Sequence, residues 1–256
     1  MISLLLAEWR RTVVETIRYP LETISSMMTL FIVFAGLFYG ATYVTHSPIG
    51  GGRLTTVVVG YAIWMTMMAA TGDLGWSIQN EAQNGTLEQV MLVPWSPVTV
   101  FLVRAFMAIL AFLIPMVVVV VALLIMTRVH LDWQWLALAP FLAALGTAWG
   151  LGLAVAAVAL LFKRVGQVLN IVQFGLLFVI LAPFARFHAV VWHLVSMVVP
   201  FNAQVLLLRN LLSHTRGSDW IWWESGINLA LIATMGILSF VGASRIARHR
   251  GILGHY

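Results

Sequence analysis

Residues 78–97 read IQNEAQNGTLEQVMLVPWSP, a polar segment between two long apolar runs, and the predicted fold is arranged around it. Asn84-Gly85 is a helix-stop signal, because glycine tolerates the left-handed conformation that closes a last helical turn. Thr86 and Gln89 match a capping box, in which both side chains pair with backbone N–H groups. Glu88 then lies in the first turn, where the helix dipole favours a carboxylate.

The same segment predicts where this short helix ends. Pro94 ends it, and Ser96-Pro97 supplies an N-cap followed by proline at the first position of the next helix. We therefore predict a helix of about two turns that joins two membrane helices and presents Glu81, Leu87 and Glu88.

The composition of the chain is that of an integral membrane protein. It has 256 residues, of which 61% are hydrophobic and 9% charged, with a mean hydropathy of +0.97; soluble chains have about 25% charged residues. We predict a single all-α membrane domain over residues 1–256. The absence of cysteine excludes disulfides and thiolate chemistry. The net charge of +5 comes from arginines at the ends of apolar runs, where they anchor spans rather than bind nucleic acid.

Six apolar runs are long enough to cross a bilayer. They cover about residues 22–44, 54–83, 98–126, 134–161, 168–184 and 225–244. The second run, about 45 Å long as a helix, exceeds the hydrocarbon core by about 15 Å and would carry the polar segment 77–97 into water. Pro115 is expected to kink the third run. Gly146, Gly150 and Gly152 give the fourth run a face for close helix packing.

Residues 1–19 have the pattern of an amphipathic helix on the membrane surface, ended by Pro20. A ladder of alternating charge occupies the face opposite the apolar one. The apolar face consists of Ile2, Leu5, Leu6, Trp9, Val13 and Ile17, and the ladder of Glu8, Arg11, Glu15, Arg18 and Glu22.

Residues 185–213 are too apolar for a free loop, and they contain Arg186 and His188. Irregular backbone cannot face hydrocarbon unless its polar groups are paired. We predict two short helices that dip into the outer leaflet, broken at Pro200, as a candidate external gate. The alternative is a seventh span over about residues 187–208. His188 and His193 have no third ligand at a suitable spacing, so no metal site is predicted.

Asp73 and Arg104 are the ionisable groups expected at similar membrane depth, and they could pair if their helices are neighbours. Such a pair would be a gate or substrate contact, or else a purely structural pair. Aromatic residues at helical spacing could likewise line a path for an apolar substrate or only pack between helices. They are Phe31, Phe34 and Phe38 on the first span, and Phe174 and Phe178 on the fifth.

The positions of Lys and Arg predict that both termini are cytoplasmic. With both termini inside, eight basic residues lie on the inner side and five on the outer, with Arg104 set aside. The inner set is Arg10, Arg11, Arg18, Lys163, Arg164, Arg245, Arg248 and Arg250, and the outer set is Arg53, Arg128, Arg186, Arg209 and Arg216.

The pattern Glu81-x3-Gly85-Thr86-Leu87-Glu88-x5-Pro94 resembles the coupling segment of ABC-2 type exporter permeases, and Pro200-Phe201-x7-Arg209 matches more loosely. The resemblance implies a permease subunit in the plasma (inner) membrane that moves an amphiphile outward, such as a drug, a lipid or a lipid-linked glycan. Two copies of a separate ATPase would bind ATP and magnesium, and this chain would have no cofactor and no catalytic residue. A second permease copy, identical or homologous, would complete a dimer in the lipid. The ATPase would contact Glu81, Gly85, Thr86, Leu87, Glu88, Met91 and Pro94.

Two other classes remain as alternatives. An ion-coupled secondary transporter usually has carboxylates at the midplane and discontinuous helices, and neither is evident in the sequence. An intramembrane enzyme would need a nucleophile and base arrangement that the sequence does not offer.

The predicted topology can be checked with single cysteines, because the chain has no native one. A cysteine at position 214 should react with an impermeant maleimide from outside the cell, and one at position 249 only from inside. Labelling of position 249 from outside would contradict both the topology and the external position of residues 185–213.

Overall fold

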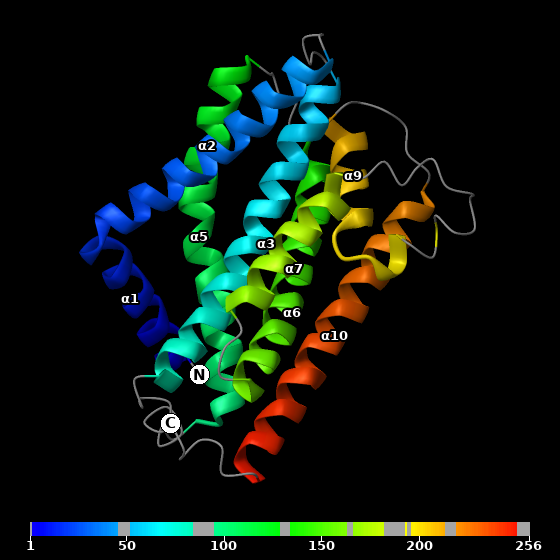
Figure 1. The fold of residues 1–256 in the computed structure, drawn as a ribbon. Coiled ribbons are helices and arrows are strands. Elements are labelled where there is room, and N and C mark those ends of the chain that lie inside the picture. Colours follow the sequence, from blue (N-terminus) through cyan, green and yellow to red (C-terminus); the bar gives the residue numbers. More distant parts are fainter. Residues whose placement is uncertain are drawn as a thin grey trace.

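A computed structural model describes residues 2–45, 52–83, 95–128, 134–162, 166–181, 193, 196–212 and 219–249. Within these ranges the chain is helical and contains no strand (Figure 1). The helices are α1 (Ile2–Arg18), α2 (Pro20–Thr45), α3 (Gly52–Gln83), α5 (Pro97–Thr127), α6 (Leu138–Leu161), α7 (Gly166–Leu181), α9 (Asn202–Leu212) and α10 (Trp220–His249), with a 3-10 turn, η1 (Trp135–Ala137), before α6.

Five helices of the described chain are long and apolar enough to cross a membrane. These candidate spans are Pro20–Gly40, Val57–Glu81, Pro97–Thr127, Trp135–Leu161 and Trp220–Ala247. They indicate a multi-pass, all-α membrane protein. The fifth predicted run corresponds to α7, whose described part has 16 residues and is not among these spans. The prediction of six spans is therefore confirmed only in part.

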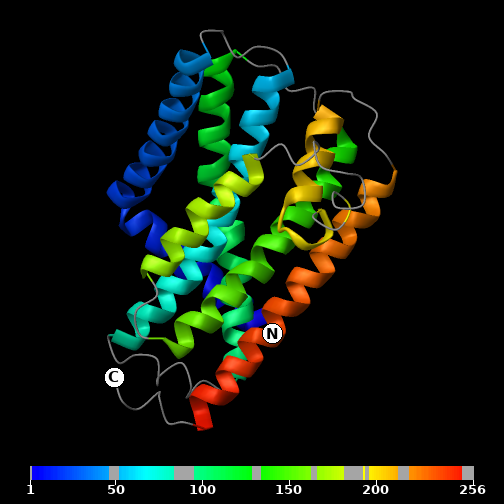
Figure 2. The ribbon, with the colours of Figure 1, turned by 45° about the vertical axis from the view of Figure 1, so that its right-hand side comes forward.

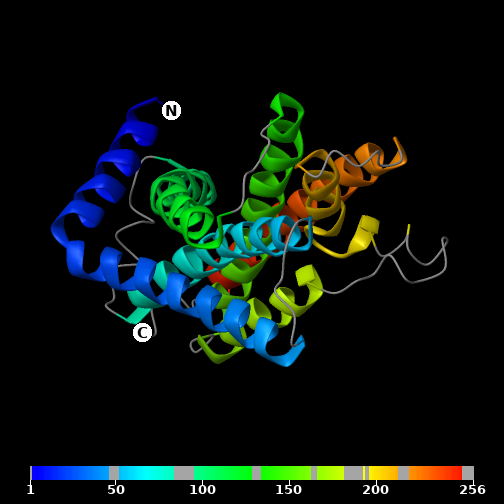
Figure 3. The same ribbon diagram turned by 90° about the horizontal axis from the view of Figure 1, so that it is seen from above.

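Helix α3 lies at the centre of the bundle (Figures 1 and 3). It packs against α5, α6, α7 and α9, and 71% of its span window is buried, against 6% for α2. The outer helices expose many large apolar side chains, such as Ile32, Ile114 and Leu238. Apolar surface on this scale marks contact with lipid or with another protein.

Trp and Tyr side chains pair their polar atoms with backbone carbonyls of neighbouring helices. The Trp64 Nε1 donates to the Gln173 carbonyl of α7 at 2.9 Å, and the Trp149 Nε1 donates to the Leu102 carbonyl of α5 at 3.2 Å. The Tyr61 hydroxyl donates to a carbonyl of α2. An apolar interior makes such pairing necessary, because an unpaired buried donor costs about 1–3 kcal/mol.

The closest helix packing joins α6 and α10, which lie side by side (Figures 1 and 2). A Cβ at Gly150 would lie 2.6 Å from the Cα of Ala233, and one at Gly146 would lie 2.6 Å from a Leu229 methyl carbon. A Cβ at Gly236 would meet the Gly150 carbonyl oxygen. The predicted close packing by small residues of the fourth run is therefore confirmed.

The start of α1, the end of α3, the start of α5 and the end of α10 share one end of the bundle (Figure 1). Helix α5 begins at Pro97 after Ser96, as predicted, although the Ser96 side chain makes no capping hydrogen bond. Residues 84–94, with the predicted helix stop and capping box, lie outside the described residues.

Before α9, the chain breaks at Pro200 as predicted. A short helical turn at 196–198 is followed by the turn at Pro200 and then by α9. Residues 182–192, with Arg186 and His188, lie outside the described residues, so the re-entrant path and its alternative, a seventh span, stay predictions.

The α6–α10 contact predicts a strong effect of one methyl group. We expect Gly236→Ala to destabilise the protein by about 1–3 kcal/mol, because the added carbon overlaps the backbone of α6. The measurement is the melting temperature of the purified protein in detergent. The matched control is Gly242→Ala on the same helix, where no atom lies within 4 Å of an added Cβ. Equal melting temperatures for the two variants would contradict this account of the packing.

Candidate functional site

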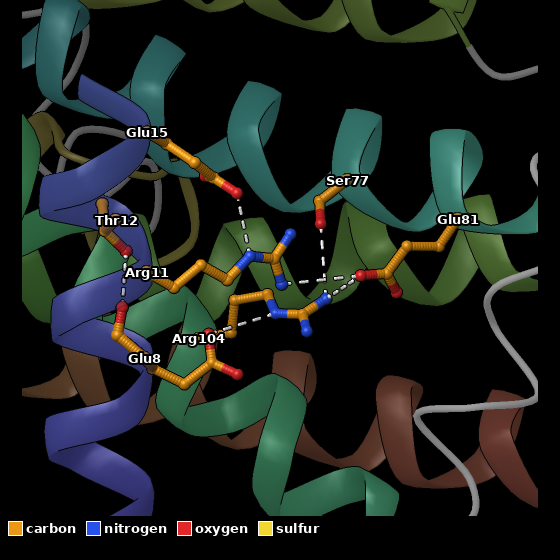
Figure 4. Close-up of polar contacts among 7 residues, drawn as sticks. All are labelled: Glu8, Arg11, Thr12, Glu15, Ser77, Glu81 and Arg104. Atoms are coloured by element: carbon orange, nitrogen blue, oxygen red, sulfur yellow. Dashed lines mark hydrogen bonds and ion pairs between the residues drawn. The ribbon is translucent and has the colours of Figure 1, made fainter. Parts of the chain in front are cut away.

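An ion-pair cluster joins α1, α3 and α5 at the end of the bundle where residues 84–94 begin (Figure 4). Arg104, about two turns into α5, is its central cation. Its Nη1 donates to the Glu81 Oε1 of α3 at 2.6 Å, and its Nε lies 3.5 Å from the Glu8 Oε2 of α1. The Ser77 hydroxyl oxygen accepts a further bond from Nη1 at 3.4 Å. One guanidinium therefore contacts side chains of two other helices.

The charged groups of this cluster are largely removed from water. The side chains of Glu8 and Arg104 are 11% exposed, and that of Glu81 is 13% exposed. The Arg104 guanidinium also lies 5.2 Å from the centre of the Phe101 ring, in a cation–π contact. Because charges here are weakly hydrated, each one depends on its partners in the cluster.

Arg11 of α1 forms the outer layer of the cluster. Its Nη1 lies 3.6 Å from the Glu81 Oε1, and its Nε donates to the Glu15 Oε1 at 2.9 Å. Burial lowers the pKa of Arg11, but the bond to Glu15 and the charges of Glu81 and Glu8 outweigh burial and raise it above its usual value. Arg11 therefore remains charged, and it links α1 to α3.

The orientation of α1 differs from a simple surface helix. Glu8 is buried against the bundle, whereas Leu6 is 63% and Ile17 is 73% exposed on the other side. We expected the charge ladder to face water, but Glu8 and Arg11 contact α3 and α5. The physical reason is Arg104, because a weakly hydrated cation requires carboxylates and α1 supplies one. The exposed apolar face is left for lipid.

The residues predicted to couple to an ATPase are only partly described. Glu81 occupies the last turns of α3, where its carboxylate is bound to Arg104 rather than projecting from the short helix. The other predicted contacts lie outside the described residues. They are Gly85, Thr86, Leu87, Glu88, Met91 and Pro94.

The predicted pairing of Asp73 with Arg104 is not among the described contacts of Arg104, which are with Glu8, Ser77, Glu81 and Phe101. The side chain of Asp73 lies outside the described residues, so this pairing stays a prediction.

The aromatic stripe of α2 packs against α3. The Phe34 ring is buried and lies 5.0 Å from the Tyr61 ring and 6.0 Å from the Phe38 ring. Phe31 packs beside them against the same core. Phe174 of α7 is 49% exposed and lies 6.2 Å from Trp64. These contacts are those of helix packing, and a role in a substrate path stays a prediction; the Phe178 side chain lies outside the described residues.

Sequence reasoning did not identify Glu8 and Ser77 as partners of Arg104. The available signal was the charge ladder of the first helix, which we interpreted as a solvated face.

Comparison with known proteins finds no matching family model, no similar curated protein and no similar solved structure. The site therefore has to be interpreted from its own geometry.

The cluster predicts that Arg104 stabilises the protein far more than an exposed cation would. We expect Arg104→Met to destabilise it by about 3 kcal/mol, because the nearly buried carboxyl groups of Glu8 and Glu81 would lose their cationic partner. The control is Glu15→Gln, which removes one exposed partner and should cost less than about 1 kcal/mol. Thermal unfolding in detergent measures both. A change for Arg104→Met as small as that for Glu15→Gln would show that the cluster contributes little.

Proposed function

We propose that this chain is the membrane permease subunit of an ATP-driven exporter of the ABC-2 type, and that residues 84–94 bind a separate ATPase. The observation that carries the proposal is the ion-pair cluster. It ties together the two helices that flank residues 84–94 and adds α1, all at one end of the bundle.

The cluster supports coupling for a mechanical reason. A push from a soluble subunit on a short connecting helix moves the membrane domain only if the flanking helices move with it. Arg104 holds α5 to Glu81 on α3 and to Glu8 on α1. Any displacement of residues 84–94 is therefore passed to three helices together instead of being absorbed by the connection.

The proposed cycle follows from this arrangement. ATP binding draws the two ATPase subunits together, and these push on the coupling segments of two permease copies. The end of α3 then tilts with α5 and α1, and the interface between the two copies opens toward the outside. The apolar, lipid-facing surface of the helices suits an amphiphilic substrate that arrives from the membrane.

One observation favours an ion-coupled secondary transporter. Glu224 is a completely buried carboxylate near the start of the last span, and carboxylates within spans often mark ion sites. Both of its oxygens, however, already contact other side chains, Ser196 and His193. We therefore rank this function second.

The proposal predicts a specific neighbour for residue 88. A photo-cross-linking amino acid at position 88, in cells that make the protein naturally, should attach to a subunit with a nucleotide-binding motif, identified by mass spectrometry. The same probe at position 214, expected on the other side of the membrane, is the control. Failure to cross-link any ATPase from position 88, with the probe incorporated, would contradict the proposal.

The same segment predicts uncoupling variants. We expect the Glu88→Arg and Leu87→Asp variants to insert normally into the membrane. They should no longer bind the ATPase identified by cross-linking or change its rate of ATP hydrolysis, because the first reverses a charge at the contact and the second removes an apolar side chain from it. Co-purification of the ATPase and its hydrolysis rate in vesicles measure this. Arg216→Glu, a charge reversal expected on the outer side, should leave both unchanged. Undiminished co-purification in both Glu88→Arg and Leu87→Asp would exclude the segment as the docking site.

A further inference from the structure

A second polar network, separate from the ion-pair cluster, joins the start of α10 to His193 and to residues 196–204. Glu224, in the second turn of α10, is completely buried. Its Oε2 accepts a hydrogen bond from the Ser196 hydroxyl at 2.5 Å, and its Oε1 contacts the Nδ1 of His193. This is no catalytic triad, because the carboxylate lies between the hydroxyl and the imidazole and the imidazole does not contact the hydroxyl through a ring nitrogen. The contacts of Glu224 hold His193 and Ser196 against α10.

Asn228, one turn further along α10, binds the backbone of the same segment. Its Nδ2 donates to the carbonyl oxygens of Met197 and Val199, both at 2.9 Å, and lies 3.4 Å from that of Ser196. Carbonyls at the end of a helical turn have no partner within the helix. In an apolar surrounding they need another donor, and Asn228 supplies it.

Gln204 of α9 extends the network to α6. Its side chain is completely buried, and its Nε2 lies 3.2 Å from both the Asn228 Oδ1 and the Thr147 Oγ1. It also lies 3.3 Å from the Ser225 carbonyl oxygen. His193 and the segment 196–204 are thus attached by side-chain contacts to α10, and Gln204 also links the segment to α6. These helices are themselves locked by the glycine contacts, so they form the fixed side of this attachment.

Phe201 shows that the attached segment is held in a strained conformation. Its φ is 67°, in the left-handed region, and its side chain is completely buried. For a residue other than glycine this conformation is unfavourable, because its Cβ comes too close to the following carbonyl oxygen. Such strain persists only where the surroundings hold it in place. Loss of the polar attachment would therefore favour a relaxed backbone with Phe201 withdrawn from the core.

We propose that Glu224 and Asn228 form a latch that holds His193 and residues 196–212 against α10, and that this attached segment is the gate of the substrate path. The role of this segment as a gate rests on the proposed function. The contacts that hold the segment in place do not depend on it. Both residues are positioning residues, because they act through the segment that they bind. Opening consists of breaking their contacts with Ser196, His193 and the carbonyls of 196–199. The strain at Phe201 favours that release, and the glycine-packed α6–α10 pair stays in place.

The test measures exposure of the segment with single cysteines. Ala203, completely buried in α9, is replaced by cysteine as the reporter, and Ala156, completely buried in α6, is replaced by cysteine as the control for global unfolding. An impermeant maleimide is added on the side from which a cysteine at position 214 reacts. In the otherwise unchanged protein, both reporters should stay unreactive.

The latch is opened with two variants that keep the number and branching of the side-chain heavy atoms. Asn228→Leu removes the amide donors and is favourable in a membrane helix, and Glu224→Gln replaces the carboxylate that contacts Ser196 and His193 with an amide. We expect cysteine 203 to react at least tenfold faster in either variant, with cysteine 156 unchanged. The latch would be overturned if cysteine 203 reacted no faster with the maleimide in either variant than in the otherwise unchanged protein. A parallel increase at position 156 in every responding variant would also overturn it, because the network would then support the whole bundle.

The two proposals can fail separately. The labelling needs no ATP and no partner, so its result is independent of cross-linking from position 88. Faster labelling of cysteine 203 in the variants, without cross-linking of an ATPase from position 88, would support the latch and contradict the exporter. Cross-linking of an ATPase from position 88, with cysteine 203 unreactive in every variant, would support the exporter and contradict this gate.

Discussion

Every polar group that enters hydrocarbon must find a partner within the protein, and the rest of this structure depends on that constraint. It makes the described chain helical, because a helix pairs its own backbone. It also explains why indole and phenol groups of α3 and α6 donate to carbonyls of adjacent helices. Where the helical turn at 196–198 ends, the Asn228 amide of α10 donates to the carbonyl oxygens of Met197 and Val199.

Under the same constraint, many of the buried charged and polar side chains of the described chain lie in two separate groups. One group is centred on Arg104 and joins α1, α3 and α5. The other is centred on Glu224 and Asn228 and joins α10 to His193 and to residues 196–204. Between them lie apolar cores and the glycine contact of α6 with α10. Packed apolar side chains therefore connect the two groups through the interior of the bundle.

The two groups differ in the kind of connection that they make. The Arg104 cluster is built from full charges with low exposure, so removing one charge leaves others unpaired and the connection resists separation. The network of Glu224 and Asn228 binds mainly hydroxyl, amide and backbone groups, and each such hydrogen bond contributes about 1 kcal/mol. The segment that the network holds contains Phe201, whose backbone is strained. Under the proposed function, the first would transmit force and the second would release the segment that it holds.

Several features were determined by the sequence alone, because they depend on neighbours along the chain. The apolar runs, the start of α5 at Pro97, the break at Pro200 and the close packing of Gly146, Gly150 and Gly152 all follow from local composition and backbone geometry. Only the tertiary structure decided which face of α1 turns inward, which carboxylates Arg104 binds, and what Glu224 holds. Glu224 and Asn228, four residues apart at the start of an apolar helix, were the available signal for the second network, but the sequence does not name their partners. Such pairings depend on the rotation of each helix about its axis and on its depth relative to neighbours about 20 to 100 residues away in the chain, and hydrophobic periodicity specifies neither.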